Sequence, residues 1–277
     1  MSLGANGVLI IGGGSALCAG KAAAIRLTNA APLSSYMGRD RLDALPAPCI
    51  AVPTTAGSGS EVSTVVVLHD PAHTGHVVIR GTGYEPDVAL LDGTLLVSLP
   101  SRPLAEAALD ALSHALEALW ARKATPFTDA LALAAAAAIR SALPEAMESR
   151  SVDALQSLID ASAMANLACG NAEMGLVHAL SAAPSVHLPH GYQNGVLLPW
   201  VAAYNRPAVG SAVAAEIDAL SALYSAIGFT PRFDGLSAVD ADAMVAAAME
   251  NPFRANNVRA ASEAELREVL RAAGAPA

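Results

Sequence analysis

Four side chains that can bind a transition metal are the most informative feature of the sequence: Asp110, His114, His178 and His190. Asp110 and His114 are spaced i, i+4 in an apolar segment, so a helix would place both on one face. One carboxylate and three imidazoles form a suitable ligand set for Fe²⁺ or Zn²⁺. If the four side chains converge in the fold, the sequence predicts a metal-assisted enzyme.

Each of these residues also has a simpler interpretation. An aspartate near the start of a helix often interacts with the helix dipole, and a histidine on an apolar face is often a hydrogen-bonded core residue. His190 stands between Pro189 and Gly191, a setting that also suits a helix cap. His187 lies three residues earlier and is an alternative ligand. Sequence spacing alone leaves these alternatives open.

Two polar loops follow short apolar segments in the first part of the chain. The loop GGGS at 12–15 stands between a predicted strand and a predicted helix, where backbone N–H groups can hold a phosphate. The alternative is a tight turn that needs glycine only for its backbone conformation. The loop PTTAGSGSEV at 53–62 combines small hydroxyl residues with glycines, which allows a ligand to approach the backbone closely. Its alternative is an ordinary polar loop.

The pattern of apolar segments predicts an α/β part followed by an all-helical part. Strands are expected at 8–11, 49–52, 63–68, 76–79 and 88–91, with a helix at about 16–27 and a turn at 70–75. Such strands are typical of a parallel sheet covered on both faces. After Leu99 the expected elements are helices, beginning near Pro103 and then spanning 126–143, 152–169, 175–180 and 190–204. We therefore predict an α/β domain over 1–98 and an all-α domain over 99–277.

Composition excludes several classes of protein. Hydrophobic residues make up 53% of the chain and charged residues 15%, which is typical of a folded protein. The net charge of −9 argues against a nucleic acid or an anionic membrane as partner. The three cysteines are scattered without a CxxC pair, and the start lacks a basic signal region, so we expect a cytoplasmic protein. The longest apolar run, at 131–139, is too short to span a bilayer.

The sequence resembles the iron-containing (type III) alcohol dehydrogenases, which share the dehydroquinate-synthase-like fold. The resemblance extends from about Val8 to Ala273, nearly the whole chain. It rests on several motifs in family order: GGGSALCAGKA at 12–22, PTTAGSGSEVS at 53–63, PDVALLD at 86–92, LDALSHALEAL at 109–119, TPFTDALAL at 125–133, GLVHAL at 175–180, PHGYQNGVLLP at 189–199 and NPFRANNVRAASEAELREVL at 251–270.

The resemblance implies an NAD(P)-linked, metal-dependent alcohol dehydrogenase or aldehyde reductase. Asp110, His114, His178 and His190 fall on the family's metal-ligand positions, and the metal would be Fe²⁺ or Zn²⁺. The metal would act as a Lewis acid on the substrate oxygen while NAD or NADP exchanges a hydride. A small alcohol or aldehyde substrate and a homo-oligomer, a dimer, are expected. The residues expected to bind the cofactor lie in the two loops: Gly13, Gly14, Ser15, Thr54, Thr55 and Ser58.

The sequence also departs from the family pattern. Only eleven residues precede the GGGS loop, where the family has about two further strand–helix units, so the nucleotide-binding domain looks truncated. Ala182 replaces a common histidine, and the segment from His178 to His190 is two residues shorter, which implies a local rearrangement at His190. Cys18 stands where the family usually has aspartate, and His76 where it has a lysine that contacts the nucleotide.

Two alternatives follow from these departures. One is a catalytically impaired or partner-dependent family remnant, because a sheet that lacks edge strands exposes unpaired backbone and apolar surface. The other is an enzyme of the maleylacetate reductase type that works without metal, a branch in which Cys18 is less unusual. The four metal-ligand positions favour the alcohol dehydrogenase branch.

Overall fold

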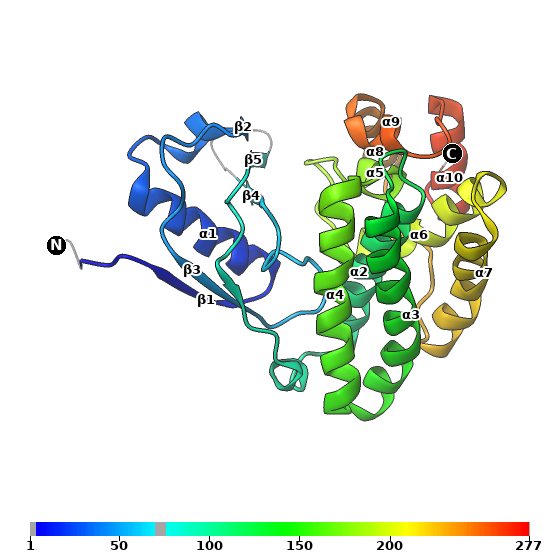
Figure 1. The fold of residues 1–277 in the computed structure, drawn as a ribbon. Coiled ribbons are helices and arrows are strands. Elements are labelled where there is room, and N and C mark those ends of the chain that lie inside the picture. Colours follow the sequence, from blue (N-terminus) through cyan, green and yellow to red (C-terminus); the bar gives the residue numbers. More distant parts are fainter. Residues whose placement is uncertain (1–3, 70–75, 277) are drawn as a thin grey trace.

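The structure is a computed structural model that describes residues 4–69 and 76–276. An α/β part formed by the first third of the chain lies beside a larger bundle of helices (Figure 1). The apolar core is divided in the same way, since the helices share one large cluster of buried residues and the α/β part has two small ones. The predicted fold class, an α/β part followed by an all-helical part, is therefore confirmed.

The strand that precedes each polar loop belongs to one small parallel sheet. Strand β3 (Cys49–Pro53) lies between β1 (Val8–Gly12) and β6 (Val88–Ala89). Helix α1 (Gly14–Thr28) follows β1 and covers one face of this sheet. The buried residues that join helix and sheet are Ile10, Leu17, Ala24, Cys49 and Ala51.

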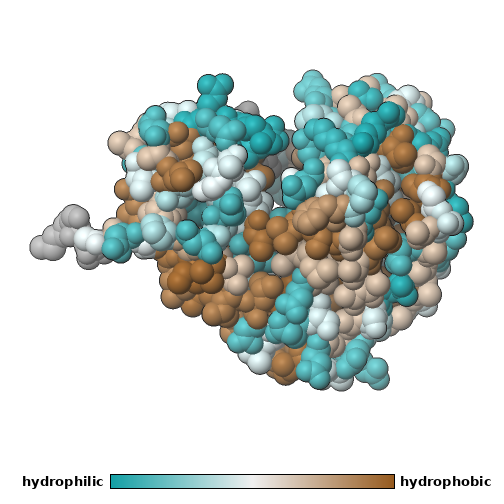
Figure 2. Space-filling model, viewed as in Figure 1, coloured by the Kyte–Doolittle hydropathy of each residue, from teal (hydrophilic) through white to brown (hydrophobic). Residues whose placement is uncertain are grey.

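The other face of this sheet is open, so the prediction of a sheet covered on both faces is wrong. Large apolar side chains that alternate with the buried ones point away from α1. Among them Leu9 is 64% exposed and Ile11 61% exposed. The same surface includes Ile50, Val88 and Leu90. Figure 2 shows apolar surface gathered on this side of the α/β part. None of the described elements packs over it.

The strands predicted at 63–68 and 76–79 belong to a second small sheet, so the prediction of one parallel sheet is wrong for them. Strand β4 (Val65–His69) pairs antiparallel with β5 (His76–Arg80), which in turn pairs parallel with β2 (Gly38–Arg39). The turn expected at 70–75 lies outside the described residues. This sheet packs on α1 through a cluster that includes Ile25, Val66 and Ile79. Helix α1 is thus shared by both sheets.

Helix α2 (Ser101–Leu119) lies within the bundle, because nearly every residue from Leu104 onwards is buried. It packs against α3 (Pro126–Ser149) and α4 (Val152–Ala172). The small alanine side chains of α3 fill much of this contact, and α3 begins with the expected Thr125 cap. The expected end of α3 near residue 143 is wrong. The helix continues through Pro144, and buried Ala146 on its last turns still contributes to the core.

The remaining elements complete the bundle around α2. Helix α3 is long and apolar enough by length and composition to cross a membrane, but it packs against α2 and α4 in this fold. Two short 3₁₀ turns, η1 (Leu33–Tyr36) and η2 (Gly93–Leu96), precede the bundle. Within the bundle the other elements are α5 (Leu176–Leu180), α6 (His190–Asn205), η3 (Arg206–Ala208), α7 (Ser211–Ala226), α8 (Ala238–Glu250), α9 (Pro252–Asn256) and α10 (Glu263–Ala272).

Candidate metal and cofactor site

Helix α2 carries three polar side chains on one face inside an otherwise apolar bundle. Asp110, His114 and Glu117 follow each other at i, i+4 and i+7, so they project in nearly the same direction. All three are buried. Buried charged groups are costly unless they are paired or bind a metal. This face of α2 is therefore a polar site in the interior of the protein.

The short helix α5 brings His178 to this face. Glu117 Oε2 lies 2.6 Å from His178 Nδ1, and Glu117 Oε1 accepts a 2.6 Å hydrogen bond from the backbone N–H of Val177. In its neutral form, with Nδ1–H donated to this carboxylate, His178 presents the lone pair of Nε2 to Asp110. A carboxylate that orients a histidine in this way is typical of metal sites. Glu117 was not among the residues predicted from the sequence, although its i+7 spacing from Asp110 was a usable signal.

Asp110, His178 and His190 converge. Their ligand atoms all lie within 4.8 Å of one another. Asp110 Oδ1 is 3.8 Å from Nε2 of His178 and 3.8 Å from Nε2 of His190. His190 comes from the first turn of α6, directly after Pro189. The shortened segment before α6 therefore still delivers His190 to the cluster.

His114 lies beside this cluster but is not part of the convergent group. Its ring stacks on His178 with the centroids 4.6 Å apart. It makes a hydrogen bond with the backbone of Gly57, while its Nδ1 is buried with no hydrogen-bond partner among the described residues. Its place as a fourth ligand remains a prediction. An unpartnered buried nitrogen next to the cluster fits that role.

The electrostatics of the cluster suit a cation. Burial lowers the pKa of His114 to about 4, so this imidazole is neutral at neutral pH. Burial alone would raise the pKa of Asp110, but the three neighbouring imidazoles and a hydrogen bond from Asn194 outweigh it and lower that pKa. A carboxylate and neutral imidazoles are the forms in which these groups bind Zn²⁺ or Fe²⁺. The donor set therefore fits the metal that the sequence implies.

The pKa of His178 moves in the opposite direction. Burial lowers it, but the hydrogen bond to Glu117 and the charges of Glu117 and Asp110 raise it above its ordinary value. Protons and a metal cation would therefore compete for this imidazole. His187, the alternative ligand, is exposed and is not one of the residues whose ligand atoms converge. Ala182 is half-buried and brings no ligand atom.

Asn194 is a second residue that the sequence analysis missed. Its Nδ2 lies 2.6 Å from Asp110 Oδ1, 3.1 Å from His178 Nε2 and 3.0 Å from His190 Nε2. It stands one helical turn after His190 on α6 and is completely buried. The amide thus contacts all three convergent ligands. Its position next to His190 on one helix face was the only signal in the sequence.

The two polar loops meet at the carboxyl ends of β1 and β3. A Cβ added at Gly13 would lie 3.2 Å from Thr55 Cγ2, and one at Gly14 would lie 2.8 Å from Ser58 Oγ. The backbone N–H of Thr54 also donates to Gly12 O at 3.0 Å. Crevices at the carboxyl ends of parallel strands are common ligand sites in α/β proteins. The expected cofactor residues therefore form one continuous surface.

The start of α1 lies on this surface. Gly13 is the residue before the helix and has no side chain to cap its first turn. Ser15 in that turn is exposed. The backbone N–H groups at such a helix start can bind a phosphate. Thr54, Thr55 and Ser58 face them as half-buried hydroxyl residues. This arrangement fits a dinucleotide phosphate, which remains a prediction for this chain.

The second loop lies between the surface formed by the two loops and the cluster of Asp110, His178 and His190. A Cβ at Gly57 would lie 2.8 Å from Ala107 O of α2, so only glycine allows this close approach. Gly57 also hydrogen-bonds His114 through its backbone. From α4, Asn166 Nδ2 donates to Ser58 O at 2.9 Å. The loop therefore fixes the distance between the two sites.

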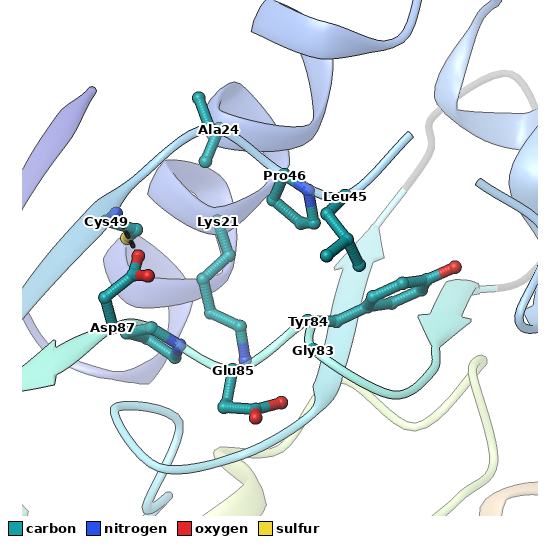
Figure 3. Close-up of a pocket in the computed structure, with 11 residues that line it drawn as sticks. Lys21, Ala24, Leu45, Pro46, Cys49, Gly83, Tyr84, Glu85 and Asp87 are labelled. Atoms are coloured by element: carbon teal, nitrogen blue, oxygen red, sulfur yellow. Dashed lines mark hydrogen bonds between the residues drawn. The ribbon is translucent and has the colours of Figure 1, made fainter. Parts of the chain in front are cut away.

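Lys21 anchors the far end of the same loop. It is buried, and its amine donates hydrogen bonds to the carbonyls of Ser60, Ser63 and Val65 at 3.2, 2.5 and 2.8 Å. Burial is the main cause that lowers the pKa of Lys21 to about 8. Figure 3 shows Lys21 beside a small pocket between α1 and the segment that contains Glu85. We assign this lysine a structural role, because its amine already has three partners.

Two further departures from the family pattern are Cys18 on α1 and His76 on β5. Cys18 is buried, with its Sγ 3.8 Å from Ser60 Oγ, and so packs under the second loop. The side chain of His76, at the position of the family's nucleotide-contacting lysine, lies outside the described residues.

Both parts of the chain match a known protein family. Residues 2–93 match the iron-containing alcohol dehydrogenase family, and residues 104–274 match its C-terminal domain. The probable alcohol dehydrogenase EutG of Escherichia coli (strain K12) is 37% identical over 278 residues, which cover 94% of this chain and 70% of EutG.

Solved structures give the same result. The crystal structure of a 1,3-propanediol oxidoreductase matches with a TM-score of 0.91 and 30% identity, over 98% of this chain and 77% of that one. Sulfoacetaldehyde reductase from Bifidobacterium kashiwanohense, solved in complex with NAD⁺, matches with a TM-score of 0.86 and 28% identity, over 97% and 76%. Since both halves of the chain match, and a relative is 37% identical over most of its length, the chain belongs to the iron-containing alcohol dehydrogenase family.

Proposed function

We propose that this chain is an NAD(P)-linked, metal-dependent alcohol dehydrogenase or aldehyde reductase that binds its metal through Asp110, His178, His190 and His114. The observation that carries the proposal is the convergence of ligand atoms from the first three residues within 4.8 Å. They come from three separate helices, α2, α5 and α6. The folded chain therefore brings together side chains that are separated in the sequence.

The proposed chemistry divides between the bound groups and the protein. Fe²⁺ or Zn²⁺ supplies a Lewis acid for the substrate oxygen, and NAD or NADP supplies or accepts the hydride. Asp110 would place one negative charge beside the divalent cation. Glu117 holds the Nδ1 proton of His178, which directs the Nε2 lone pair into the cluster. Asp110 and His178 are buried, which strengthens their electrostatic contacts, whereas His190 is exposed and leaves the cluster open on one side.

The cofactor would lie along the surface formed by the two loops. Its phosphates would bind the N–H groups at the start of α1, from Gly13, Gly14 and Ser15, opposite the hydroxyl groups of Thr54, Thr55 and Ser58. The NAD⁺ complex of sulfoacetaldehyde reductase supports a nicotinamide cofactor in this fold. Because the second loop also contacts α2, a cofactor bound there would lie next to the proposed metal ligands.

Metal analysis combined with a nicotinamide titration tests this function. We expect purified protein reconstituted with Zn²⁺ or Fe²⁺ to hold one metal ion per chain and to quench or shift NADH fluorescence. His178→Ala should lose the metal, whereas His187→Ala, which alters an exposed histidine outside the cluster, should retain it. Absence of both metal and cofactor binding in the wild-type protein would contradict the proposal. Full activity in a strong chelator would instead support the metal-independent, maleylacetate reductase type.

A second candidate is an enzyme that needs another chain to be active. The observation that favours it is the open sheet face with Leu9, Ile11, Ile50, Val88 and Leu90, since apolar patches of this kind often mark protein interfaces. We expect a homo-oligomer, a dimer. Light scattering together with activity measured against protein concentration tests this candidate. Full activity of a monomer would contradict it.

We also propose a cytoplasmic location and a small alcohol or aldehyde substrate. The three cysteines, Cys18, Cys49 and Cys169, are all free thiols and buried, which suits a reducing compartment. The similarity to the probable alcohol dehydrogenase EutG and to the 1,3-propanediol oxidoreductase supports a substrate with a hydroxyl group.

A further inference from the structure

Asn194 is the polar side chain whose contacts are hardest to reconcile with a bound cation. Its Nδ2 lies 2.6–3.1 Å from Asp110 Oδ1, His178 Nε2 and His190 Nε2, the same three atoms that would bind the metal. A side-chain amide has two N–H hydrogens, so it cannot donate to all three atoms at once. The amide nitrogen therefore lies at the point where the three ligands converge.

The tautomer of His178 fixes which contacts are hydrogen bonds. In the neutral imidazole, the form that binds a metal, Nδ1 of His178 donates to Glu117 and Nε2 is an acceptor. Asp110 is ionised and also accepts. The two N–H groups of Asn194 can therefore bridge Asp110 and His178, with His190 Nε2 at 3.0 Å. The amide holds together side chains from α2, α5 and α6.

A cation cannot share this position with the amide nitrogen. Zn²⁺ binds imidazole nitrogen and carboxylate oxygen at about 2.0–2.2 Å. With ligand atoms 3.8 Å apart, a cation at such distances lies between them, against the amide hydrogens. Those hydrogens carry positive partial charge, and an amide nitrogen that bears them does not ligate. The side chain has to turn away before the metal can bind.

The other end of the amide has little to hold it in place. Asn194 Oδ1 is buried and has no hydrogen-bond partner in the part of the chain that the structure describes. An unpartnered buried carbonyl oxygen is costly. The present rotamer is therefore maintained by the contacts of Nδ2 with the ligand cluster. If those contacts are lost to a cation, no other hydrogen bond of the side chain opposes its rotation.

We propose that Asn194 is a positioning residue that stands in for the metal: it holds Asp110, His178 and His190 together before the cation binds, and it is displaced when the cation arrives. The inference rests on the proposed metal centre and deepens it. It implies that Asn194 stabilises the metal-free protein and competes with metal binding. Removal of the Asn194 amide should therefore lower the stability of the metal-free protein and increase the affinity for the metal.

The experiment compares chelator-treated wild type, Asn194→Ala and Asn205→Ala. Asn205 is a matched control because it is a fully buried asparagine on the same helix, and its amide pairs with Asn257 instead of the three convergent ligands. Thermal midpoints are measured with and without Zn²⁺, and Zn²⁺ affinity is measured by competition with a chromophoric chelator. Asn194→Ser is included because it keeps a polar group that is too short to bridge the ligands, in case the alanine variant does not fold.

We expect both Asn194 variants to bind Zn²⁺ about tenfold more tightly than wild type. Their metal-free midpoints should fall by about 3 °C, and saturating Zn²⁺ should recover most of that loss. Asn205→Ala should lower the midpoints with and without Zn²⁺ alike and leave the affinity unchanged. Unchanged or weaker Zn²⁺ binding by the Asn194 variants would overturn the inference. Failure of wild type to bind Zn²⁺ would overturn the metal centre itself, and this result is distinguishable because it does not depend on Asn194.

Discussion

Glu117 and His178 are joined by a 2.6 Å contact between a fully buried carboxylate oxygen and imidazole Nδ1. The second oxygen of the carboxylate accepts from the N–H of Val177, at the start of the helix that carries the histidine. Glu117 therefore positions both the ring and its helix. It connects α2 to α5 across the interior of the bundle and fixes the tautomer that a metal ligand needs.

Glu117→Gln should weaken metal binding without removing any ligand. The glutamine preserves the volume but not the charge, and its amide no longer determines which nitrogen of His178 carries the proton. Loss of such an outer partner lowers metal affinity about 10- to 100-fold. Chelator competition measures the change. Glu106→Gln is the matched control, since Glu106 is buried on the same helix but pairs with Arg102. Equal affinities for the two variants would contradict this role.

His114→Ala tests the fourth ligand. If the imidazole binds the metal, its loss should lower Zn²⁺ affinity by about a hundredfold or more, because a direct ligand contributes more than an outer partner. Circular dichroism establishes that the variant folds, and isothermal calorimetry measures the affinity. His187→Ala, in an exposed histidine, should bind as wild type does. An unchanged affinity in His114→Ala would show that His114 is a core residue beside a three-ligand site.

Gly14→Ala should weaken cofactor binding but not metal binding. A Cβ at this position would lie 2.8 Å from Ser58 Oγ, so the two loops would be pushed apart. We expect NADH affinity to fall about tenfold, equivalent to roughly 1.4 kcal/mol. Gly170→Ala is the control, because a Cβ there meets no atom within 4 Å and the substitution favours the helix. A Gly14→Ala protein with wild-type NADH affinity would argue against the loop surface as cofactor site.

Glu61 should give the protein a distinct pH dependence. Burial raises the pKa of Glu61 to about 7. The folded state therefore binds more protons than the unfolded state between about pH 4.5 and 7, and the free energy of unfolding falls as the pH rises through this range. Over this range the free energy of unfolding falls by about 3 kcal/mol.

Glu61→Gln should abolish that loss. Urea unfolding at pH 5 and pH 8 measures it, and the variant should exceed wild type in stability only at pH 8. Glu85→Gln, which alters an exposed carboxylate on the neighbouring pocket, should leave the wild-type pH dependence in place. Equal stability of Glu61→Gln and wild type at pH 8 would show that the carboxylate ionises in the fold without penalty.

Much of the fold followed from local pattern. The strands at Val8 and Cys49 were predictable because short apolar runs end at glycine or proline, and Thr125-Pro126 marked the start of α3. Asp110, His178 and His190 were identifiable as metal-binding types, and the structure brings them together. The end of α3 was not predictable, because tertiary packing of Ala146 overrides the effect of Pro144.

The parts that sequence did not predict depend on contacts between distant segments. Glu117 and Asn194 resemble many buried polar residues until α5 and α6 bring His178 and His190 beside them. Exposed apolar sheet surface was expected only under the family-remnant alternative, and the open face was not assignable to residues, since Leu9 and Ile11 alternate with buried residues as in any covered strand. A single sequence records side-chain types and spacing, but it does not record which faces remain uncovered.

Metal content measured alongside activity tests the central claim most directly. Wild-type protein reconstituted with Fe²⁺ or Zn²⁺ and desalted should contain one metal ion per chain and oxidise an alcohol with NAD or NADP. The variants Asp110→Ala and His178→Ala, verified as folded by circular dichroism, should contain essentially no metal and show no activity. Retention of metal by these variants, or undiminished activity of metal-free wild type, would contradict the account.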